Sequence, residues 1–180
     1  MVGVHSNAAA RRAGARPRGS RDRRARVPGK VCAHAPSREE RTWRLAIADT
    51  GHDRVLLCAH DGEVLAEHGG LYQPQGVRWA DDGDSLLVCE TGAGRVWRIA
   101  TDGASTLVTD ALASPWDVVG WHGHVVVAEA GRHRLWAIDA DGEPQVIAGS
   151  GGKGLFDGPA LGAGLAQPSG LAVTAGDELA

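Results

Sequence analysis

The sequence lacks three features that would decide its class at once. It has no apolar run long enough to span a membrane, and no apolar residues spaced three and four apart as in a helix. It has only three cysteines, Cys32, Cys58 and Cys89, without a C-x-x-C pair or a metal-binding spacing. Helical, membrane-spanning and disulfide-stapled proteins are therefore excluded. We expect a soluble, cytoplasmic protein whose cysteines are small buried core residues.

The formal net charge of -3 hides two segments of opposite sign. Residues 1–26 contain eight arginines and one acid, a net charge of +7, whereas residues 27–180 contain 11 basic and 21 acidic side chains, a net charge of −10. Because the first segment has no apolar period, we expect residues 1–26 to be a disordered basic arm. Three interpretations of this arm are possible: a nucleic-acid-binding tail, a transit peptide, or an extension without a function of its own. We favour the extension and predict no nucleic-acid partner.

What the sequence does contain is a repeat of about 40 residues. An acid-x-Gly segment that leads to an arginine starts at Asp49, Glu90 and Glu129, at offsets of 41 and 39 residues. The same offsets separate three Asp-Gly pairs, Asp61-Gly62, Asp102-Gly103 and Asp141-Gly142. A Pro-x-x-Val-like element introduces each copy, at Pro74–Val77, Pro115–Val118 and Pro168–Leu171, with a weaker one at Pro28–Val31. Landmarks that keep one period indicate a repeat architecture.

Each repeat reads as four short strands joined by turns. In the second copy we expect strands at Gly76–Ala80, Ser85–Cys89, Arg95–Ala100 and Ser105–Thr109. Asp-Gly between apolar runs is a strong hairpin signal, because both residues tolerate positive φ. A four-stranded antiparallel sheet at this period is the signature of a propeller blade. We predict an all-β, open ring of about three and a half blades, at residues 27–70, 74–110, 115–150 and, for the start of the next, 168–180.

The repeat motif resembles that of NHL-repeat β-propellers. Ile47–Val55 is similar to the NHL core, except that Asp53 stands where a histidine usually precedes the arginine. A closer resemblance is to the thioredoxin-plus-propeller type, that of NHL repeat-containing protein 2. The segments that carry it are Ser114–Val119, Ala130–Ala137, Ala148–Gly151 and Gln167–Leu171. This resemblance implies a complete propeller of about six blades, and we expect the chain to be a fragment of it. It also implies a redox accessory role through a thioredoxin-like domain. Nothing before Val27 resembles such a domain.

An acid and an arginine stand five residues apart in every copy of the repeat. The pairs are Asp49 and Arg54, Glu90 and Arg95, and Glu129 and Arg134. The acid ends one strand and the arginine opens the next, so we expect each pair to meet at the mouth of one hairpin. Recurrence in every blade favours a structural pair over a charged ring for an anionic ligand.

Trp116-Asp117 is the best candidate for binding because it breaks the repeat pattern. Gln75-Gly76 and Ser169-Gly170 stand at the same place in the sister copies. Local packing explains the two residues equally well. Trp97 and Trp136, by contrast, occupy equivalent positions, and we expect them to pack between blades.

Two further candidates, His133 and Lys153, lie in loops. His133 belongs to a turn between the second and third strands of a blade, and Lys153 to the long connection Gly149–Gln167. Such turns and the connections between blades gather on one face of a propeller, where loops commonly carry binding residues. We therefore expect His133 and Lys153 to share a binding face with Trp116 and Asp117.

The repeat supports two functions from different classes. We favour a non-catalytic interaction scaffold that binds a protein or peptide on its loops, and predict no catalytic residue, cofactor or metal. The alternative is a metal-dependent, lactonase-like hydrolase or lyase, which needs acids or histidines on the innermost strands. Those strands offer Arg78, with Asp117 just before one of them. The open ends also predict self-association, with exposed apolar residues in Val31–Leu57 and Leu171–Leu179.

Overall fold

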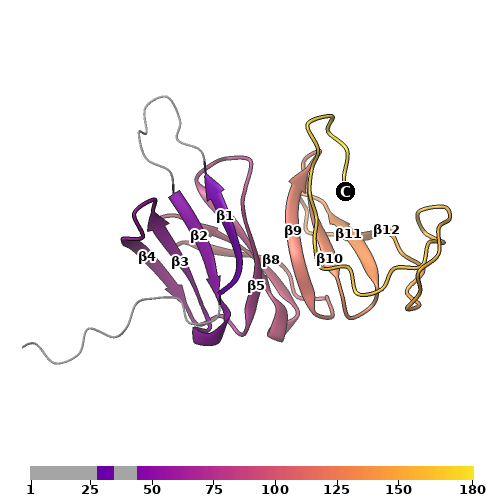
Figure 1. The fold of residues 1–180 in the computed structure, drawn as a ribbon, viewed down its shortest axis with the longest axis horizontal. Coiled ribbons are helices and arrows are strands. Elements are labelled where there is room, and N and C mark those ends of the chain that lie inside the picture. The colour runs from indigo at the N-terminus through magenta and orange to yellow at the C-terminus, as the bar shows by residue number, and fades with distance from the viewer. Residues whose placement is uncertain (1–27, 35–43) are drawn as a thin grey trace, which may run out of the picture.

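The computed structural model describes residues 28–34 and 44–180. These residues form three four-stranded antiparallel sheets, in each of which every strand pairs with its neighbours in sequence (Figure 1). The all-β, blade-like architecture predicted from the repeat is confirmed. The predicted disordered arm at residues 1–26 lies outside the described residues. No helix in the described part of the chain is long and apolar enough to cross a membrane.

The strands follow the repeat in order. The first sheet contains β1 (Pro28–His34), β2 (Arg44–Asp49), β3 (Arg54–Ala59) and β4 (Val64–Gly69). The second contains β5 (Pro74–Trp79), β6 (Ser85–Glu90), β7 (Arg95–Ala100) and β8 (Ser105–Thr109). The third contains β9 (Pro115–Trp121), β10 (His124–Glu129), β11 (Arg134–Ile138) and β12 (Pro144–Ala148).

The outer hairpin of each sheet turns at the predicted Asp-Gly pair. Gly62, Gly103 and Gly142 have φ values of 88°, 99° and 85°, a region that suits glycine. In the second sheet the amide of Gly103 donates to the carbonyl of Ala100, and the Asp102 carboxylate accepts from the amide of Ala104. The predicted hairpin turns at Asp102-Gly103 and Asp141-Gly142 are therefore confirmed.

The turns between second and third strands meet the connections between blades. The hydroxyl of Thr50 donates to the carbonyl of Pro74 at 2.6 Å, and that of Thr91 to the carbonyl of Pro115 at 2.5 Å. The amide of Gly92 also donates to the carbonyl of Tyr72. These turns and connections therefore lie on one side of the arc. We call this side the loop face; its residues are 50–53, 70–74, 91–94, 111–116, 130–133 and 149–169.

The core lies between neighbouring blades. Val55 and Leu71 from the first repeat pack with Val77 and Val88 of the second, and Trp97 is partly buried against them. Trp136 packs in the same way on the cluster between the second and third sheets. The predicted packing of Trp97 and Trp136 between blades is confirmed.

The segment after Pro168 covers the third sheet. Leu171 is 5% exposed and packs with Val126 and Ala128, and the indole of Trp121 donates to the carbonyl of Asp177 at 3.1 Å. The prediction that Leu171–Leu179 would be abnormally exposed is therefore wrong for Leu171, because this segment folds back onto the sheet. Leu56 and Leu57 are also buried, whereas Val31 and Val173 are exposed. Self-association stays a prediction.

Candidate functional site

The first strands of the three sheets bring the same repeat position together. β5 contacts both β1 and β9. In each of these strands the pairing shifts register just after the proline of the Pro-x-x-Val element. The third residue of that element is Lys30 in β1, Gly76 in β5 and Asp117 in β9. A bulge of this kind changes the direction of a side chain. The residue at the bulge is charged in β1 and β9 and is glycine in β5, which lies between them.

Asp117 is the centre of this arrangement. Its side chain is fully buried and accepts from Lys30 Nζ at 2.5 Å and from Arg78 Nη2 at 3.1 Å. The amide of Leu171 donates to the same oxygen at 2.8 Å, and the amide of Val118 donates to the other at 3.0 Å. Four donors from four segments therefore satisfy one buried carboxylate, as a buried charge requires. We call Lys30, Arg78 and Asp117 the inner-strand cluster.

Gly76 makes the approach of β5 to β9 possible. A Cβ at this position would lie 2.8 Å from the carbonyl oxygen of Trp116 and 3.0 Å from Cα of Asp117. Any other residue would push the two strands apart. Gly76 and Asp117 are therefore complementary. Because Gly76 has no side chain, β5 leaves room for the backbone of β9 at Trp116 and Asp117.

The two cations of the inner-strand cluster also hold the backbone of the next repeat. Lys30 Nζ donates to the carbonyl of Ser169 at 2.5 Å, and Arg78 Nη2 to that of Leu171 at 3.0 Å. Their side chains are 28% and 33% exposed, and two cations face one carboxylate. The cluster thus carries one excess positive charge and joins all four repeats.

Trp116 lies next to the cluster but points to a different environment. Its side chain is 39% exposed, and it lines a hollow of about 240 Å³ together with Ala130, Gln167 and Ser169. Trp116 and Asp117 are adjacent in sequence but have different roles. Asp117 is a buried ion-pair partner, whereas Trp116 is accessible at the surface.

The other two predicted binding residues have different surroundings. His133 Nδ1 accepts from the amide of Gln167 at 3.1 Å, so His133 holds the part of the connection that lines the Trp116 hollow. Lys153 is exposed in the same connection and is not among the residues that line this hollow. The structure thus brings His133 near Trp116 through Gln167 and does not bring Lys153 there.

The three acid–arginine pairs differ from one another. Arg54 Nε donates to Asp49 at 2.7 Å, as predicted, and its Nη1 donates to Glu67 at 3.0 Å. Arg95 lies 3.7 Å from Glu90 and is 46% exposed, so this pair is loose. Only the first pair is therefore the tight, buried ion pair that the repeat suggested.

In the third repeat the predicted pair is replaced. Glu129 accepts from the indole of Trp136, the amide of Ala113 and the guanidinium of Arg132, at 2.7, 2.7 and 2.9 Å. Arg134 instead lies against Gly151, and its buried Nε has no hydrogen-bond partner in the described part of the chain. The backbone register sets Arg134 opposite Glu129 at the mouth of this hairpin, as predicted, but the side chain that contacts the acid is the indole of Trp136, two residues further on.

A first stability prediction follows for these arginines. Arg54→Ala should lower the free energy of unfolding by about 2–3 kcal/mol, because it removes a charge-assisted partner from the buried Asp49. Arg95→Ala, the matched variant in the second repeat, should cost less than about 0.5 kcal/mol. Urea unfolding followed by circular dichroism measures both. Equal losses would contradict the assignment.

The three cysteines lie in apolar surroundings. Burial raises the pKa of Cys32 to about 11 and raises the pKa values of Cys58 and Cys89 as well. A neutral thiol is a poor nucleophile, so these residues are not built for thiol redox chemistry. No group of three His, Cys, Asp or Glu side chains that could hold a metal ion is found among residues 28–34 and 44–180.

We expect all three thiols to react at least about tenfold more slowly with a disulfide reagent at pH 8 in the native protein than in the unfolded one. The raised pKa of Cys32 favours its neutral form in the folded state. Its contribution to stability is present below pH 9 and is lost as the pH rises through about 11. The rates are measured at pH 8, with and without guanidinium, from the thiol that the disulfide reagent releases when it reacts with a cysteine. One fast native thiol would contradict the burial.

No protein-family model and no curated protein matches the sequence. Solved structures do match. A streptogramin B lyase structure is 18% identical with a TM-score of 0.60, and virginiamycin B lyase from Staphylococcus aureus is 16% identical with a TM-score of 0.61. An auxiliary nutrient binding protein from Bacteroides thetaiotaomicron is also 16% identical with a TM-score of 0.61. These matches cover 76%, 84% and 84% of this chain.

The chain spans less than half of each of these structures, 43%, 48% and 41% respectively. Two of the three are named as lyases and one as a binding protein, so the likeness crosses functional classes. At such low identities it shows the fold and not the chemistry. Together with the three antiparallel four-stranded sheets, it establishes that this chain has the fold of a β-propeller.

Proposed function

We propose that this chain is a non-catalytic binding module of the NHL propeller type, which binds a partner protein or peptide on its loop face. The observation that carries the proposal is the exposure of Trp116 beside a hollow lined by Gln167 and Ser169. Tryptophan is enriched among the few residues that dominate binding energy at interfaces. A hollow beside it offers a partner side chain a place to bury.

Trp116 is presented rigidly. On one side, the carbonyl of Pro115 accepts the hydroxyl of Thr91 at 2.5 Å. On the other side, Asp117 is held by the inner-strand cluster. Little conformational freedom of the backbone remains to be lost on binding, which favours affinity.

Other apolar side chains are exposed on the loop face. They are Tyr72, Leu155, Phe156 and Leu161, at 55%, 90%, 55% and 61%. All of them belong to connections between blades, and the connection before β9 leads directly to Trp116. Exposed apolar residues gathered on one face are typical of a protein-binding surface.

The residues of the inner strands support binding over metal chemistry. A propeller hydrolase or lyase of the alternative type would present free carboxylates or imidazoles there. The described inner strands present Lys30 and Arg78, and the carboxylate of Asp117 is engaged by four donors. A redox accessory role would depend on a thioredoxin-like domain, and no thiol of the described residues supports it.

Selection of peptides tests the proposal. A phage-displayed peptide library is selected against the immobilised chain, and the enriched peptides are titrated by calorimetry. We expect Trp116→Ala to weaken them at least about tenfold, as truncation of an interface hot spot does. Leu107→Ala is the matched control, because Leu107 is 42% exposed on the outer strand β8. It should change affinity less than about twofold.

Two results would overturn this assignment. In one, every enriched peptide binds Trp116→Ala and the unchanged chain equally. In the other, Leu107→Ala weakens binding as much as Trp116→Ala does. Thermal melting of both variants shows that they are folded, so that a loss of binding is not a loss of structure.

A further inference from the structure

The inner-strand cluster holds more positive charge than its acid requires. Lys30 and Arg78 form ion pairs with Asp117 and with no other acid among the described residues. One cation would balance one buried carboxylate, so one positive charge is left over. This surplus lies in a strongly acidic body, because residues 27–180 have a net charge of −10. The balance of charge in the cluster is therefore incomplete.

Arg78 is a departure from the repeat. It stands in β5 at the place that Cys32 takes in β1 and Val119 takes in β9. A position that is apolar in the sister strands thus carries a guanidinium in β5. Because Lys30 already pairs with Asp117 from β1, the ion pair alone does not account for a second cation.

Both cations keep donors that the protein does not use. The two N–H groups of Arg78 Nη2 are engaged by Asp117 and by the carbonyl of Leu171. Its Nε and Nη1 make no hydrogen bond with the described residues, and neither atom is buried. Lys30 uses two of its three N–H groups, on Asp117 and on the carbonyl of Ser169. Donors on both cations are therefore available to a ligand.

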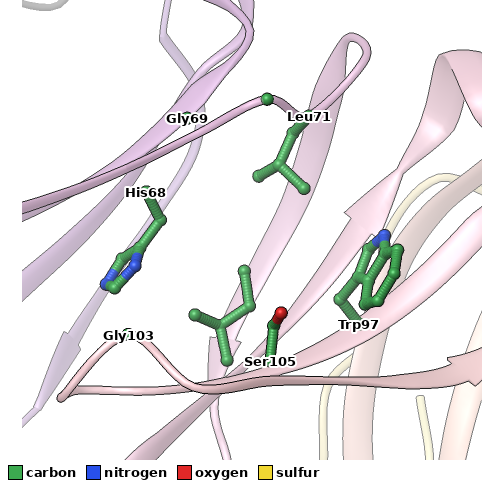
Figure 2. A pocket seen from close by; sticks show the side chains of 8 residues that line it. His68, Gly69, Leu71, Trp97, Gly103 and Ser105 are labelled. Carbon is green, nitrogen blue, oxygen red and sulfur yellow. The ribbon is translucent and has the colours of Figure 1, made fainter.

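The hollow between the first and second blades, of about 190 Å³, offers no such groups. Figure 2 shows His68 and Trp97 on opposite sides of it. None of its eight lining residues is an acid, a lysine or an arginine. Nε2 of His68 is buried, so a ligand in the hollow does not reach it. An ion would lose its hydration there without gaining a charged partner, whereas the inner-strand cluster supplies both charge and open donors.

The charge of the cluster selects the kind of anion. A monoanion brings the cluster to neutrality, whereas a dianion leaves a negative charge beside the buried Asp117. Lys30 and Arg78 contact the same oxygen of Asp117, so the two cations are neighbours. A carboxylate has one charge and two oxygens, and it can accept a charge-assisted hydrogen bond from each cation.

We propose that the inner-strand cluster binds one carboxylate group, which accepts from Lys30 and Arg78. The proposal does not depend on the loop-face function. The site adjoins the Trp116 hollow, because Ser169 lines that hollow and its carbonyl accepts from Lys30. The carboxylate therefore belongs either to a small free acid or to a peptide whose neighbouring side chain enters the hollow.

Titration of the full chain, followed by NMR of the Arg78 Nε–H group and the Leu171 amide, tests the site. The matched ligands are acetate, its neutral analogue acetamide, and the dianion sulfate, all at constant ionic strength because salt screens charges. Acetate should shift both resonances saturably, with a Kd on the order of 10 mM for so small a ligand. Acetamide should bind at least about fivefold more weakly, and sulfate more weakly than acetate.

Two cation variants separate the site from the general charge of the protein. Lys30→Met removes the surplus charge and should weaken acetate at least about fivefold. Arg98→Met is the matched control, because it removes the same charge from β7, where Arg98 is 40% exposed and pairs with Asp82. It should change the affinity for acetate less than about 1.5-fold. Thermal melting shows whether both variants are folded.

Three results would overturn the proposal: no saturable shift with acetate, binding of acetamide or sulfate as tight as that of acetate, or equal effects of Lys30→Met and Arg98→Met. The ligand comparison decides even if Lys30→Met fails to fold. A failed peptide selection for the loop face leaves the acetate result standing, so the two proposals fail separately.

N-Acetyl-leucine identifies the source of the carboxylate, because it adds an apolar side chain to the acid. Binding at least about fivefold tighter than that of acetate, with the gain removed by Trp116→Ala, would assign the carboxylate to a peptide on the loop face. Binding no tighter than that of acetate would assign it to a small free acid.

Discussion

Asp117→Ala is expected to lower the free energy of unfolding by about 3–4 kcal/mol, the largest effect of any single truncation considered for this chain. The carboxylate is fully buried and accepts from Lys30, Arg78 and the amide of Leu171. Its removal leaves the two cations facing each other and leaves the amides of Leu171 and Val118 without this acceptor. For a domain of this size the melting temperature should fall by roughly 6–15 °C. Urea and thermal unfolding followed by circular dichroism measure both quantities.

The control for Asp117 is an acid that is exposed. Asp110→Ala removes the same charge from the surface of the second repeat and should change the free energy of unfolding by less than about 0.5 kcal/mol. Asp117→Asn keeps an acceptor of the same shape and should fall between the two. A loss below about 1 kcal/mol for Asp117→Ala would show that the inner-strand cluster is rehydrated and not structural.

Glu129→Ala is expected to cost about 3 kcal/mol, and Arg134→Ala close to nothing. Glu129 is fully buried and accepts from the side chains of Trp136 and Arg132 and from the amide of Ala113. Its loss leaves a partly buried indole and a partly buried amide without acceptors, each at about 1–3 kcal/mol, partly relieved by water. Arg134 has no bond to Glu129 to lose.

The matched comparison for Glu129 is Glu129→Gln. The amide oxygen still accepts from one donor, so the loss should be about half that of alanine. The melting temperatures of the three variants should therefore rank as Arg134→Ala, then Glu129→Gln, then Glu129→Ala, with the last the lowest. A larger loss of unfolding free energy for Arg134→Ala than for Glu129→Ala would contradict this assignment. It would indicate that Arg134 and Glu129 form an ion pair.

The sequence predicts the blades well because their determinants are local. Asp102-Gly103 and Asp141-Gly142 specify hairpins through backbone conformations that few other residues adopt. The apolar runs between them are too short for helices and repeat with the period of the turns. Strand order then follows from hairpin connections, which need no information from distant parts of the chain.

The candidate site is predicted less completely because it depends on distant residues. Trp116 and Asp117 are detectable as a break in the repeat, but their different roles are not. Lys30 was not predicted, although it shares the repeat position of Asp117 in the weak first copy of the motif. Aligning that copy with the others would have placed a cation opposite the acid. Trp136 contacts Glu129, and Trp97 contacts Glu90 in the same way, so a tryptophan seven residues after the acid is a repeat position from which this contact could have been predicted.

The bond between Lys30 and Ser169 joins positions 139 residues apart. In a row of repeats each unit contacts only its neighbours, and the row can open from either end. Here the same carboxylate holds β1, β5 and the segment that follows Pro168, so loosening either end removes a partner from the other. The entropy of closing so long a loop grows only with the logarithm of its length. The arc should therefore unfold as one cooperative unit, and its two ends should exchange their amide hydrogens together.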